Sequence, residues 1–446
     1  MEQQATITTL TLFITVVLSV MTLGLPRKYI LLPYVIGACW VPADQTVMIG
    51  ELNFQVLRIL VVVGVLRLVI RGEVVPLRWH RFDSLIVAWA VVGSIIYVLQ
   101  WMSMAAVINR CGRLLEWLGL YWVFRQSIRS WDDVRFAYGA LAVCAIAMVP
   151  FVVIEWGNGA NPFGALGRVT TLVREGNYRC QATFPHAIMM GLFWATLVPL
   201  YVVFARYGHK LLFWTAVVAS AFMIKATNSS TPVLTLVAVF PLLAAYKWRN
   251  LTKAAGWTVV VMLVTLHVVM KAPVWHLIAR VGVISGSTGW HRYNLINEAI
   301  NHFSEWMVLG TRSTEHWGRG LIDVTNQFIL EGVRGGFISL VLFCAILFIG
   351  GRAAVRLSLR TRDARESHYC WGVFVTILVH GLSFLGVAYF GQITMIWYLL
   401  LASVGLIYGK LYGQAETAGH GVTAASRVLS QPGVTRGSGS YASSSA

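Results

Sequence analysis

The chain has few charged residues for its length. Of its 446 residues, 12% are Asp, Glu, Lys or Arg, whereas 57% are hydrophobic. A soluble domain carries about 25% charged residues, so this composition argues against a water-soluble enzyme with several domains. Ten-residue stretches of alternating hydrophobicity are also missing, which disfavours an outer-membrane barrel.

Cysteine is scarce as well. The six Cys residues stand singly along the chain, without a Cys-x-x-Cys pair and without the Cys/His spacing of a zinc site. An Asp-x-Asp motif, which would suggest a divalent metal, is absent too. We therefore expect neither a bound metal nor a cofactor.

Long apolar runs, such as Thr6 to Leu25 and Phe337 to Gly350, dominate what is present. A helix needs about 20 apolar residues to cross a bilayer. We therefore expect an all-α, polytopic membrane protein with about 12–13 transmembrane helices. The predicted spans are 6–25, 29–43, 55–70, 84–102, 104–124, 136–155, 186–205, 211–225, 231–246, 256–270, 335–351, 370–389 and 391–409.

The net charge of +17 first suggests a nucleic-acid partner, but the positions of the basic residues argue against one. They cluster at every second connection between apolar runs, as the positive-inside rule requires of cytoplasmic loops. We therefore expect contact with the lipid bilayer and none with nucleic acid. The clusters are Arg27 and Lys28; Arg71, Arg78 and Arg81; Arg125, Arg129 and Arg135; Arg206 and Lys210; Lys247, Arg249 and Lys253; and Arg352 through Arg365.

This orientation divides the chain into a transmembrane helical domain, 1–413, and a tail, 414–446. The tail is rich in Gly, Ser, Ala and Thr, a composition that favours disorder, and it lies on the cytoplasmic side. Two long loops, 156–185 and 271–325, lie on the opposite, periplasmic face. Long loops in a compact fold are usually functional or disordered. Because these two carry Trp, His, Arg and acidic residues, we expect the active site there.

The first loop brings Arg174 and Arg179 close to the next apolar run, which begins at His186. Guanidinium groups bind phosphate and pyrophosphate through paired N–H donors. Contact with lipid headgroups, or plain solvation, is the alternative for these arginines. His186 fits a general base, a residue that starts a helix, or a structural histidine.

The second loop contains an amphipathic helical segment, Trp290 to Trp306, with Arg292 just off its polar stripe. Such a helix lies on a membrane surface or caps a bundle, and a solvated polar face is the plainer interpretation. The polar stripe is His291, Asn294, Glu298, Asn301 or His302, and Glu305; the apolar stripe is Tyr293, Ile296, Ile300 and Phe303.

Further polar residues lie at the start of an apolar run or within one. Charged residues near the bilayer interior are costly and tend to line a site or pair with each other. Glu331 and Arg334 are three residues apart and fit either description. The others are Asp323, Asn326 and Gln327 before the third-last run; Arg110, Arg113 and Glu116, which form an ion-pair ladder or a polar pathway; and 227–232, which closes a turn or binds a ligand.

Four short patterns resemble those of one known family. Arg179 to Gly191 is similar to its Arg-x-x-Gly-x-Phe-x-His-Pro-Asn region, with Gln181 or Ala182 at the glycine and the His-Pro order changed. Residues 229–232 look like its Ser-x-Ser-Arg turn without the arginine. Arg292, the amphipathic segment and Gly310 are similar to its Arg-x-x-x-Trp…Pro-x-x-Gly-x-Gly stretch.

The fourth pattern in the family is His followed by Asn, Ser or Gln, nine residues and Gly. Here Thr325 stands at the histidine position, followed by Asn326, nine residues and Gly336. With these patterns, the chain resembles the O-antigen ligase and Wzy-type polysaccharide polymerase superfamily of bacterial inner-membrane glycosyltransferases. The missing histidine matters, because it is regarded as the family's catalytic residue.

The resemblance implies a metal-independent glycosyltransferase in the bacterial inner membrane, with its active site on the periplasmic side. Its donor would be an oligosaccharide on undecaprenyl pyrophosphate, and its acceptor a glycan or lipid A core. The acceptor hydroxyl attacks the anomeric carbon and the lipid pyrophosphate leaves, so no nucleotide cofactor is needed. A chain-length regulator and a flippase are candidate partners.

The resemblance and the chemistry together assign candidate roles. Arginines stabilise the charge of the leaving pyrophosphate, and we expect Arg179 and Arg292 to do so. Contacts with the glycan are assigned to His186, Thr325, Asn326 and Arg334. Thr325 cannot act as a base at neutral pH. The substitutes for a general base are Asp323, His316, His302, Glu298 and His186.

The missing histidine favours polymerisation of an exopolysaccharide or O-antigen repeat over ligation to lipid A core. A membrane transporter and a non-catalytic protein that binds lipid-linked glycan are alternatives of a different class. Transporters usually show repeated halves, and the sequence has no convincing internal repeat.

Overall fold

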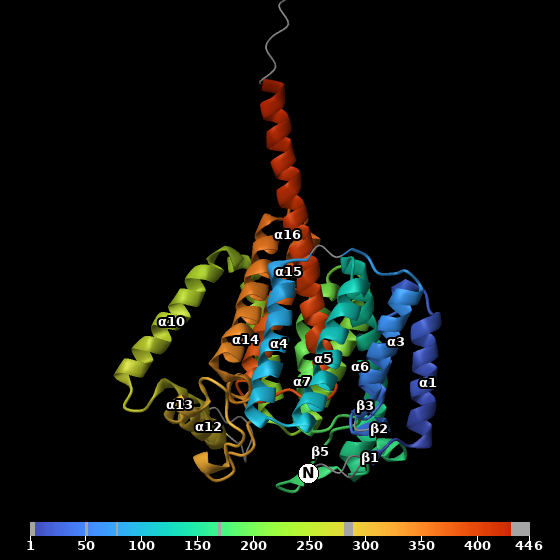
Figure 1. Ribbon diagram of the computed structural model, residues 1–446, viewed down its shortest axis with the longest axis vertical. Coiled ribbons are helices and arrows are strands. Elements are labelled where there is room, and N and C mark those ends of the chain that lie inside the picture. The colour runs from blue at the N-terminus through green and yellow to red at the C-terminus, as the bar shows by residue number, and fades with distance from the viewer. Residues whose placement is uncertain (1–4, 50–51, 77–78, 168–170, 281–288, 430–446) are drawn as a thin grey trace, which may run out of the picture.

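The computed structural model describes residues 5–49, 52–76, 79–167, 171–280 and 289–429. It is mostly helical, and within these residues each of the thirteen predicted runs coincides with one helix (Figure 1). The helices are α1 (Thr9–Gly24), α2 (Leu32–Trp40), α3 (Val56–Ile70), α4 (Arg81–Trp101), α5 (Met104–Ser127), α6 (Trp131–Asn158), α7 (Ala187–Ala205), α8 (Lys210–Ala226), α9 (Ser230–Ala244), α10 (Thr252–Val269), α14 (Gln327–Arg360), α15 (Ala364–Phe384) and α16 (Ile393–Leu429).

Within the described residues, six helical stretches are long and apolar enough to cross a membrane. They are α4, α6, α7, α9 with α10, α14, and α16 up to Tyr412. α2 has nine residues, or about 14 Å of helix, which is half of a hydrocarbon core. After α2 the chain nevertheless lies at the end of the bundle where α1 begins. The contact that shows this is the hydrogen bond from the Thr8 amide to Gln45 Oε1, at 3.0 Å.

Successive connections alternate between two ends of the bundle (Figure 1). At the basic end, which comprises 25–31, 71–76, 79–80, 128–130, 206–209, 245–251 and 361–363, the connections contact one another. Arg27 forms a salt bridge with Asp133 at 3.8 Å there, and the hydroxyls of Tyr246 and Ser367 lie 2.9 Å apart. Every described residue of the predicted basic clusters belongs to this end, where α16 projects beyond the bundle.

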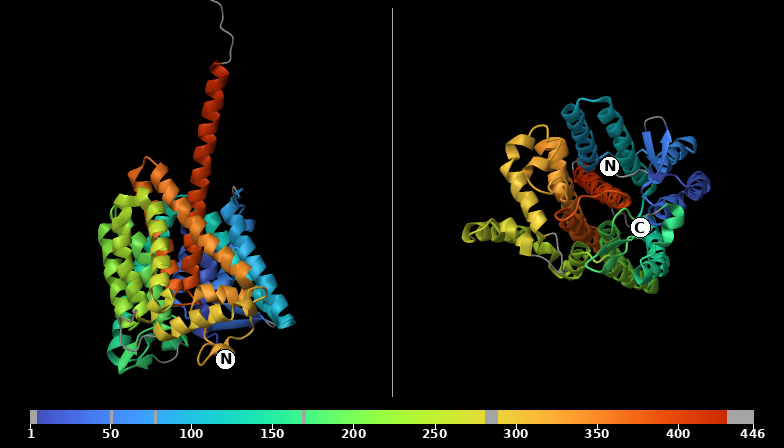
Figure 2. Two further views of the ribbon diagram at one scale, coloured as in Figure 1. Left: turned by 90° about the vertical axis from the view of Figure 1, so that its left-hand side faces the viewer. Right: turned by 90° about the horizontal axis from the view of Figure 1, so that it is seen from below.

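The opposite end, which we call the loop end, carries the two long loops and two small sheets that the sequence did not predict. Strands β1 (Ala5–Thr6), β2 (Gln45–Ile49) and β3 (Leu52–Gln55) form one sheet, with β1 parallel and β3 antiparallel to β2. β4 (Leu172–Arg174) and β5 (Asn177–Arg179) form an antiparallel hairpin. Figure 2 (right) shows this end of the molecule.

The core centres on α7, whose residues are all buried except Ile188. α10 is the opposite case, because none of its residues is buried and it stands apart from α14 (Figure 1). It packs mainly on the 3₁₀ turns at its two ends, η3 (Ala245–Leu251) and η4 (Val274–His276). α10 then leads into the second long loop.

That loop contains α11 (Leu277–Arg280), α12 (Gly289–Asn301), α13 (Phe303–Trp306) and the 3₁₀ turn η5 (Glu315–Trp317). The predicted amphipathic segment is therefore helical, with one interruption at His302. Part of the predicted apolar stripe is exposed, since Ile300 and Phe303 are 48% and 38% exposed. Leu295, Ala299 and Trp306 are buried instead, because they pack in a small separate core with Trp317, Leu321 and Val333.

α14 begins eight residues before the predicted span, since a polar first segment continues into the same helix. α16 continues as a helix to Leu429, past residue 414, where the sequence predicted the start of a disordered tail. Residues 430–446 of that tail lie outside the described residues.

Candidate active site at the loop end

A cavity of about 960 Å³ opens among the loops and helix ends of the loop end. Its lining is strongly basic, with Asp323 as the one carboxylate among the described residues that form it. The arginines of the lining are Arg113, Arg174, Arg179, Arg292, Arg312 and Arg334, and its histidines are His186 and His291. A cavity of this size and charge suits a large anionic ligand.

The β4–β5 hairpin places two of these arginines on one face. Glu175 and Gly176 both have positive φ, 49° and 74°, as a two-residue hairpin turn requires. Arg174 lies opposite Asn177 in the register, and Arg179 is two residues further along the second strand. Because side chains alternate along a strand, Arg174 and Arg179 point to the same side, toward the cavity.

Arg179 and Arg292 come from different loops, and they bind to the turn between α8 and α9 and to the first turn of α9, respectively. Arg179 Nη2 donates to Ser229 Oγ at 2.7 Å. Arg292 Nη2 donates to Thr231 Oγ1 at 2.9 Å, and its Nε donates to the Gly386 carbonyl at 3.1 Å. All of these acceptors are neutral, and within the described residues neither arginine has a carboxylate partner. Their charge therefore remains available to a ligand in the cavity.

The environment of both arginines disfavours their charge. Burial, and secondly the nearby Arg174 guanidinium, lower the pKa of Arg179 and of Arg292. The repulsion among the three groups is compensated when an anion binds beside them. The electrostatics thus agree with an anion-binding site.

Glu155, which the sequence interpretation missed, holds the end of the first loop in place. Its carboxylate is fully buried and accepts from the backbone amides of Gln181 at 3.0 Å and Ala182 at 2.9 Å. Ala182, at the glycine position of the family pattern, has a left-handed φ of 48°, which glycine adopts freely. The signal for Glu155 was a lone acidic residue at the end of the apolar run 136–155.

His186 starts α7. Its Nδ1 accepts from the Ile188 amide at 3.1 Å, so the side chain caps the helix while also lining the cavity. Of the alternatives for this histidine, the helix-starting residue is the one that this contact supports.

Asn326 caps α14 at the base of the cavity. Its Oδ1 accepts from the amides of Phe328 at 2.9 Å and Ile329 at 3.2 Å, and its Nδ2 donates to the Leu385 carbonyl at 3.1 Å. Asn326 does not belong to the cavity lining, whereas the adjacent Thr325 does. The Thr325 hydroxyl oxygen is buried and, within the described residues, has no hydrogen-bond partner.

Gly336 interrupts α14 with a φ of 68°. A Cβ at this position would overlap the Val308 carbonyl oxygen, and the next amide, of Phe337, donates to the Met307 carbonyl at 2.9 Å. Only glycine suits this backbone and this close approach. The pattern Asn326, nine residues, Gly336 therefore marks the two ends of a short helical segment, 327–335, that carries Arg334.

The predicted base candidates separate into two groups. Asp323 lines the cavity, is exposed within it, and its carboxylate has no hydrogen-bond partner among the described residues. Glu298, His302 and His316 lie outside the lining. The geometry therefore brings Asp323, and not the other three, to the same cavity as the arginines.

The three other candidates belong to an exposed cluster around α13. His316 Nε2 lies 2.9 Å from Glu305 Oε2, and the His302 ring stacks on Trp317 with 5.3 Å between centroids. Burial opposes ionisation of Glu305, but hydrogen bonds from Thr311, His316 and Trp317 outweigh it and lower its pKa. These contacts account for His302 and Glu305 of the polar stripe without a ligand.

A smaller side pocket adjoins the cavity, and the two share Arg113, Leu330, Arg334 and Tyr389 in their linings. The predicted ladder of Arg110, Arg113 and Glu116 does not form, since Glu116 forms a salt bridge with Arg58 at 3.0 Å. The two arginines line the side pocket instead.

Among the described residues, no group of three or more His, Cys, Asp or Glu side chains could hold a metal ion. The absence of a metal and of a cofactor from the reaction stays a prediction. Comparison with protein-family models, with curated proteins and with solved structures finds no match to this chain.

Proposed function

We propose that the protein is a polytopic glycosyltransferase of the bacterial inner membrane, related to the O-antigen ligase and Wzy-type polymerase superfamily. It would polymerise oligosaccharide repeats carried on undecaprenyl pyrophosphate during exopolysaccharide or O-antigen synthesis. The observation that carries this proposal is that Arg179 and Arg292, from two separate loops, line one cavity and bind neighbouring residues at the start of α9. Neither charge is paired with a carboxylate within the described residues, which suits a pyrophosphate ligand.

The distribution of charge supports the proposed orientation. The described basic clusters gather at the basic end, which the positive-inside rule assigns to the cytoplasm. The loop end and its cavity would then face the periplasm, at the level where a lipid-linked sugar is exposed. A transmembrane role for the bundle is supported by its long apolar helices.

The proposed reaction needs two kinds of group at the cavity. An acceptor hydroxyl attacks the anomeric carbon of the donor, and the bond from that carbon to the pyrophosphate oxygen breaks. The electron pair leaves with the lipid pyrophosphate, whose charge the preorganised Arg179 and Arg292 stabilise. The hydroxyl proton passes to a base, which contributes about 10²–10⁴-fold to the rate.

Asp323 is the base that the geometry supports best. It is the one carboxylate among the described residues that line the cavity, and its oxygens are free to accept a proton. Glu298, His302 and His316 are less well supported, because contacts outside the cavity already engage them. Asp323→Asn should slow the reaction without weakening the binding of lipid pyrophosphate.

The test is an assay of the purified chain with oligosaccharide on undecaprenyl pyrophosphate. We expect a ladder of products, and a rate about 10²–10³-fold lower in Arg179→Ala and in Arg292→Ala. Arg360→Ala is the matched control, because this exposed arginine lies at the basic end of α14. An unchanged ladder in the double variant would overturn the pyrophosphate assignment.

The same assay separates the alternatives. A single shift of lipid A core in place of a ladder would identify a ligase. Movement of the lipid-linked sugar across liposomes without a covalent product would identify a transporter. Binding of the lipid-linked glycan without any product would identify a non-catalytic protein. Reporter tags at Gly176 and Gly320 that prove cytoplasmic would contradict the orientation itself.

A further inference from the structure

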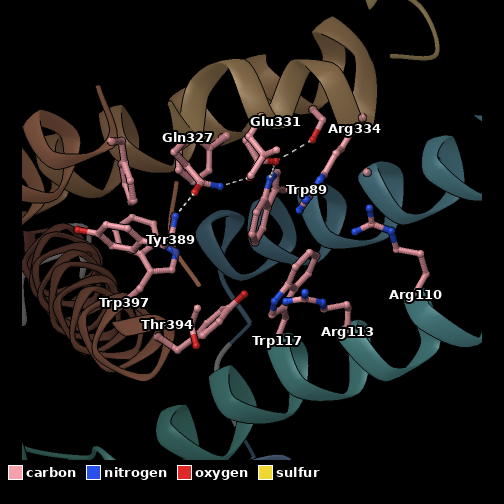
Figure 3. A pocket seen from close by; sticks show the side chains of 17 residues that line it. Trp89, Arg110, Arg113, Trp117, Gln327, Glu331, Arg334, Tyr389, Thr394 and Trp397 are labelled. Carbon is pink, nitrogen blue, oxygen red and sulfur yellow. Dashed lines mark hydrogen bonds between the residues drawn. The ribbon is translucent and has the colours of Figure 1, made fainter. Parts of the chain in front are cut away.

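The side pocket next to the cavity has a volume of about 80 Å³ and lies between α4, α5, α14 and α16 (Figure 3). Arg113 from α5 and Arg334 from α14 line both spaces. A ligand in the cavity can therefore extend a substituent into the side pocket.

The charges of the side pocket do not balance. Its lining holds Arg110, Arg113 and Arg334 against one carboxylate, Glu331. That carboxylate is bound by neutral donors: Gln327 Nε2 at 2.7 Å, Trp89 Nε1 at 2.8 Å and Ser339 Oγ at 3.2 Å. These contacts, drawn in Figure 3, replace the predicted pairing of Glu331 with Arg334.

Two of the arginines have no hydrogen bond and no salt bridge within the described residues. These are Arg113 and Arg334, and Figure 3 shows both beside the pocket. The third, Arg110, lies over the Tyr97 ring, 3.6 Å from its centroid, in a cation–π contact. Arg113 is half-buried, and Arg334 is exposed where the side pocket opens into the cavity, with the Glu331 carboxylate as a nearby charge of opposite sign. Guanidinium groups in this position are available to an anionic ligand. The arrangement therefore indicates a second anion-binding position, separate from Arg179 and Arg292.

Aromatic side chains line the side pocket and its opening. Trp89 and Trp117 stack with 5.4 Å between their centroids, and Trp397 and Tyr389 also belong to the lining. Tyr389, which lines both spaces, offers apolar contact to a pyranose ring that remains in the cavity, while the arginines bind a polar substituent that enters the side pocket. A site of this composition recognises a ring that also carries an acid group.

The side pocket is large enough only for a group at the end of a ligand's substituent. The pyrophosphate of a lipid-linked sugar is bonded on both sides, to the lipid and to the sugar, so it needs a space that is open in two directions. The cavity of about 960 Å³ provides this space, whereas about 80 Å³ accommodates only the end of a substituent. A carboxylate matches the planar N–H pairs of arginine and has this size.

We propose that Arg113 and Arg334 bind the carboxylate of an acidic sugar, such as a uronate, in the glycan that enters the cavity. The substrate class is then an acidic oligosaccharide. This inference rests on the proposed function, since that function supplies the glycan.

The test measures binding of D-glucuronate, D-glucose and inorganic phosphate to the purified full chain in detergent, by quenching of tryptophan fluorescence. We expect glucuronate to bind at least tenfold more tightly than glucose. Arg113→Gln and Arg334→Gln should each weaken glucuronate about tenfold and leave glucose unchanged. Arg334→Lys, which keeps the charge but loses the paired donors, should weaken it less.

Arg360→Gln is the matched control, because this exposed arginine lies at the basic end of α14 and lines neither the cavity nor the side pocket. It should leave glucuronate binding unchanged. Equal affinity for glucuronate and glucose would overturn the proposal. Tighter binding of phosphate than of glucuronate would overturn the assignment of a carboxylate.

Farnesyl pyrophosphate, measured on the same variants, distinguishes this proposal from the proposed function. Its binding should fall in Arg179→Ala and Arg292→Ala and persist in Arg334→Gln. If it persists in all three variants, the proposed function fails whatever glucuronate does. If it is lost in Arg334→Gln, the side pocket is part of the pyrophosphate site and the separate carboxylate position is wrong.

Discussion

Arg67 at the basic end and two cavity arginines at the loop end have different kinds of partner. At the basic end, Arg67 binds both carboxylate oxygens of Glu73 at 3.0 Å, and Lys410 forms a salt bridge with Glu366. At the loop end, Arg179 and Arg292 are held by hydroxyl and carbonyl oxygens, which fix a guanidinium without neutralising it. A neutral partner positions a guanidinium group and leaves its charge uncompensated, whereas a carboxylate partner neutralises that charge. The comparison predicts that substitutions at the basic end affect stability and that substitutions at the loop end affect activity.

Arg67→Met should have the largest effect on stability. The Arg67 side chain is fully buried and also donates to the Thr22 carbonyl at 2.6 Å, so its loss leaves Glu73 and Thr22 without this partner. Breaking such a pair costs about 3–5 kcal/mol. Unfolding in denaturant, with Arg71→Met as the exposed control on the same helix, measures it. Loss of activity in folded Arg67→Met would break the comparison.

Gly336→Ala should destabilise by about 1–3 kcal/mol, the range for backbone strain, and should also abolish polymerisation. The positive φ and the close approach of Val308 leave no room for a Cβ, so the loop before η5 must move away from α14. The control is Gly139→Ala in α6, where a Cβ meets no atom within 4 Å. Retained activity in Gly336→Ala would show that this loop does not shape the cavity.

Removing one helix cap at each end compares the ends directly. Ser130 caps α6 at the basic end and Asn326 caps α14 at the loop end. Each change to Ala should cost about 1 kcal/mol. Only Asn326→Ala should also lower the polymerisation rate, because the segment that it caps carries Arg334. The rates of both variants are measured at the same concentration of folded protein. An equal loss of rate in Ser130→Ala and Asn326→Ala would contradict the difference between the two ends.

The smallest effect concerns pH. The hydrogen bond and charge of Arg67 lower the pKa of Glu73, so the unfolded chain takes up this proton at higher pH than the folded chain does. The stabilisation is complete above the usual glutamate pKa of about 4.3 and is lost as pH falls through the lowered pKa. Melting temperatures from pH 6 down to pH 3 should show this loss. Glu73→Gln should flatten the decline, and an unaltered slope would remove Glu73 as its source.

The positions of the helices could be predicted because apolar runs and polar connections differ in composition along the chain. The first residues of α14 escaped prediction for the same reason, since Gln327, Glu331 and Arg334 interrupt the apolar pattern without interrupting the helix. The charge of the loops also pointed to Arg179 and Arg292, and both line the cavity.

Features that depend on partners far apart in sequence could not be predicted in this way. The buried side of α12 is decided by Trp317 and Val333, which follow it in the chain, and not by its own periodicity. Glu155 and Ala182 form one unit through backbone amides, which carry no sequence signal. The two-residue turn at Glu175 and Gly176 could in principle be predicted. The strands on either side are only three residues long, which is too short for a pattern of alternation to be recognised.

The isolation of α10 has a mechanical consequence. This helix of 18 residues, about 27 Å long, has no buried side chain and is held mainly at its two ends. In a bilayer, acyl chains would contact it on every side, and its tilt would follow the thickness of the surrounding lipid. Its far end leads to α12, which carries Arg292. The thickness of the lipid would thereby act on the second long loop through α10, which the described residues hold mainly at its two ends.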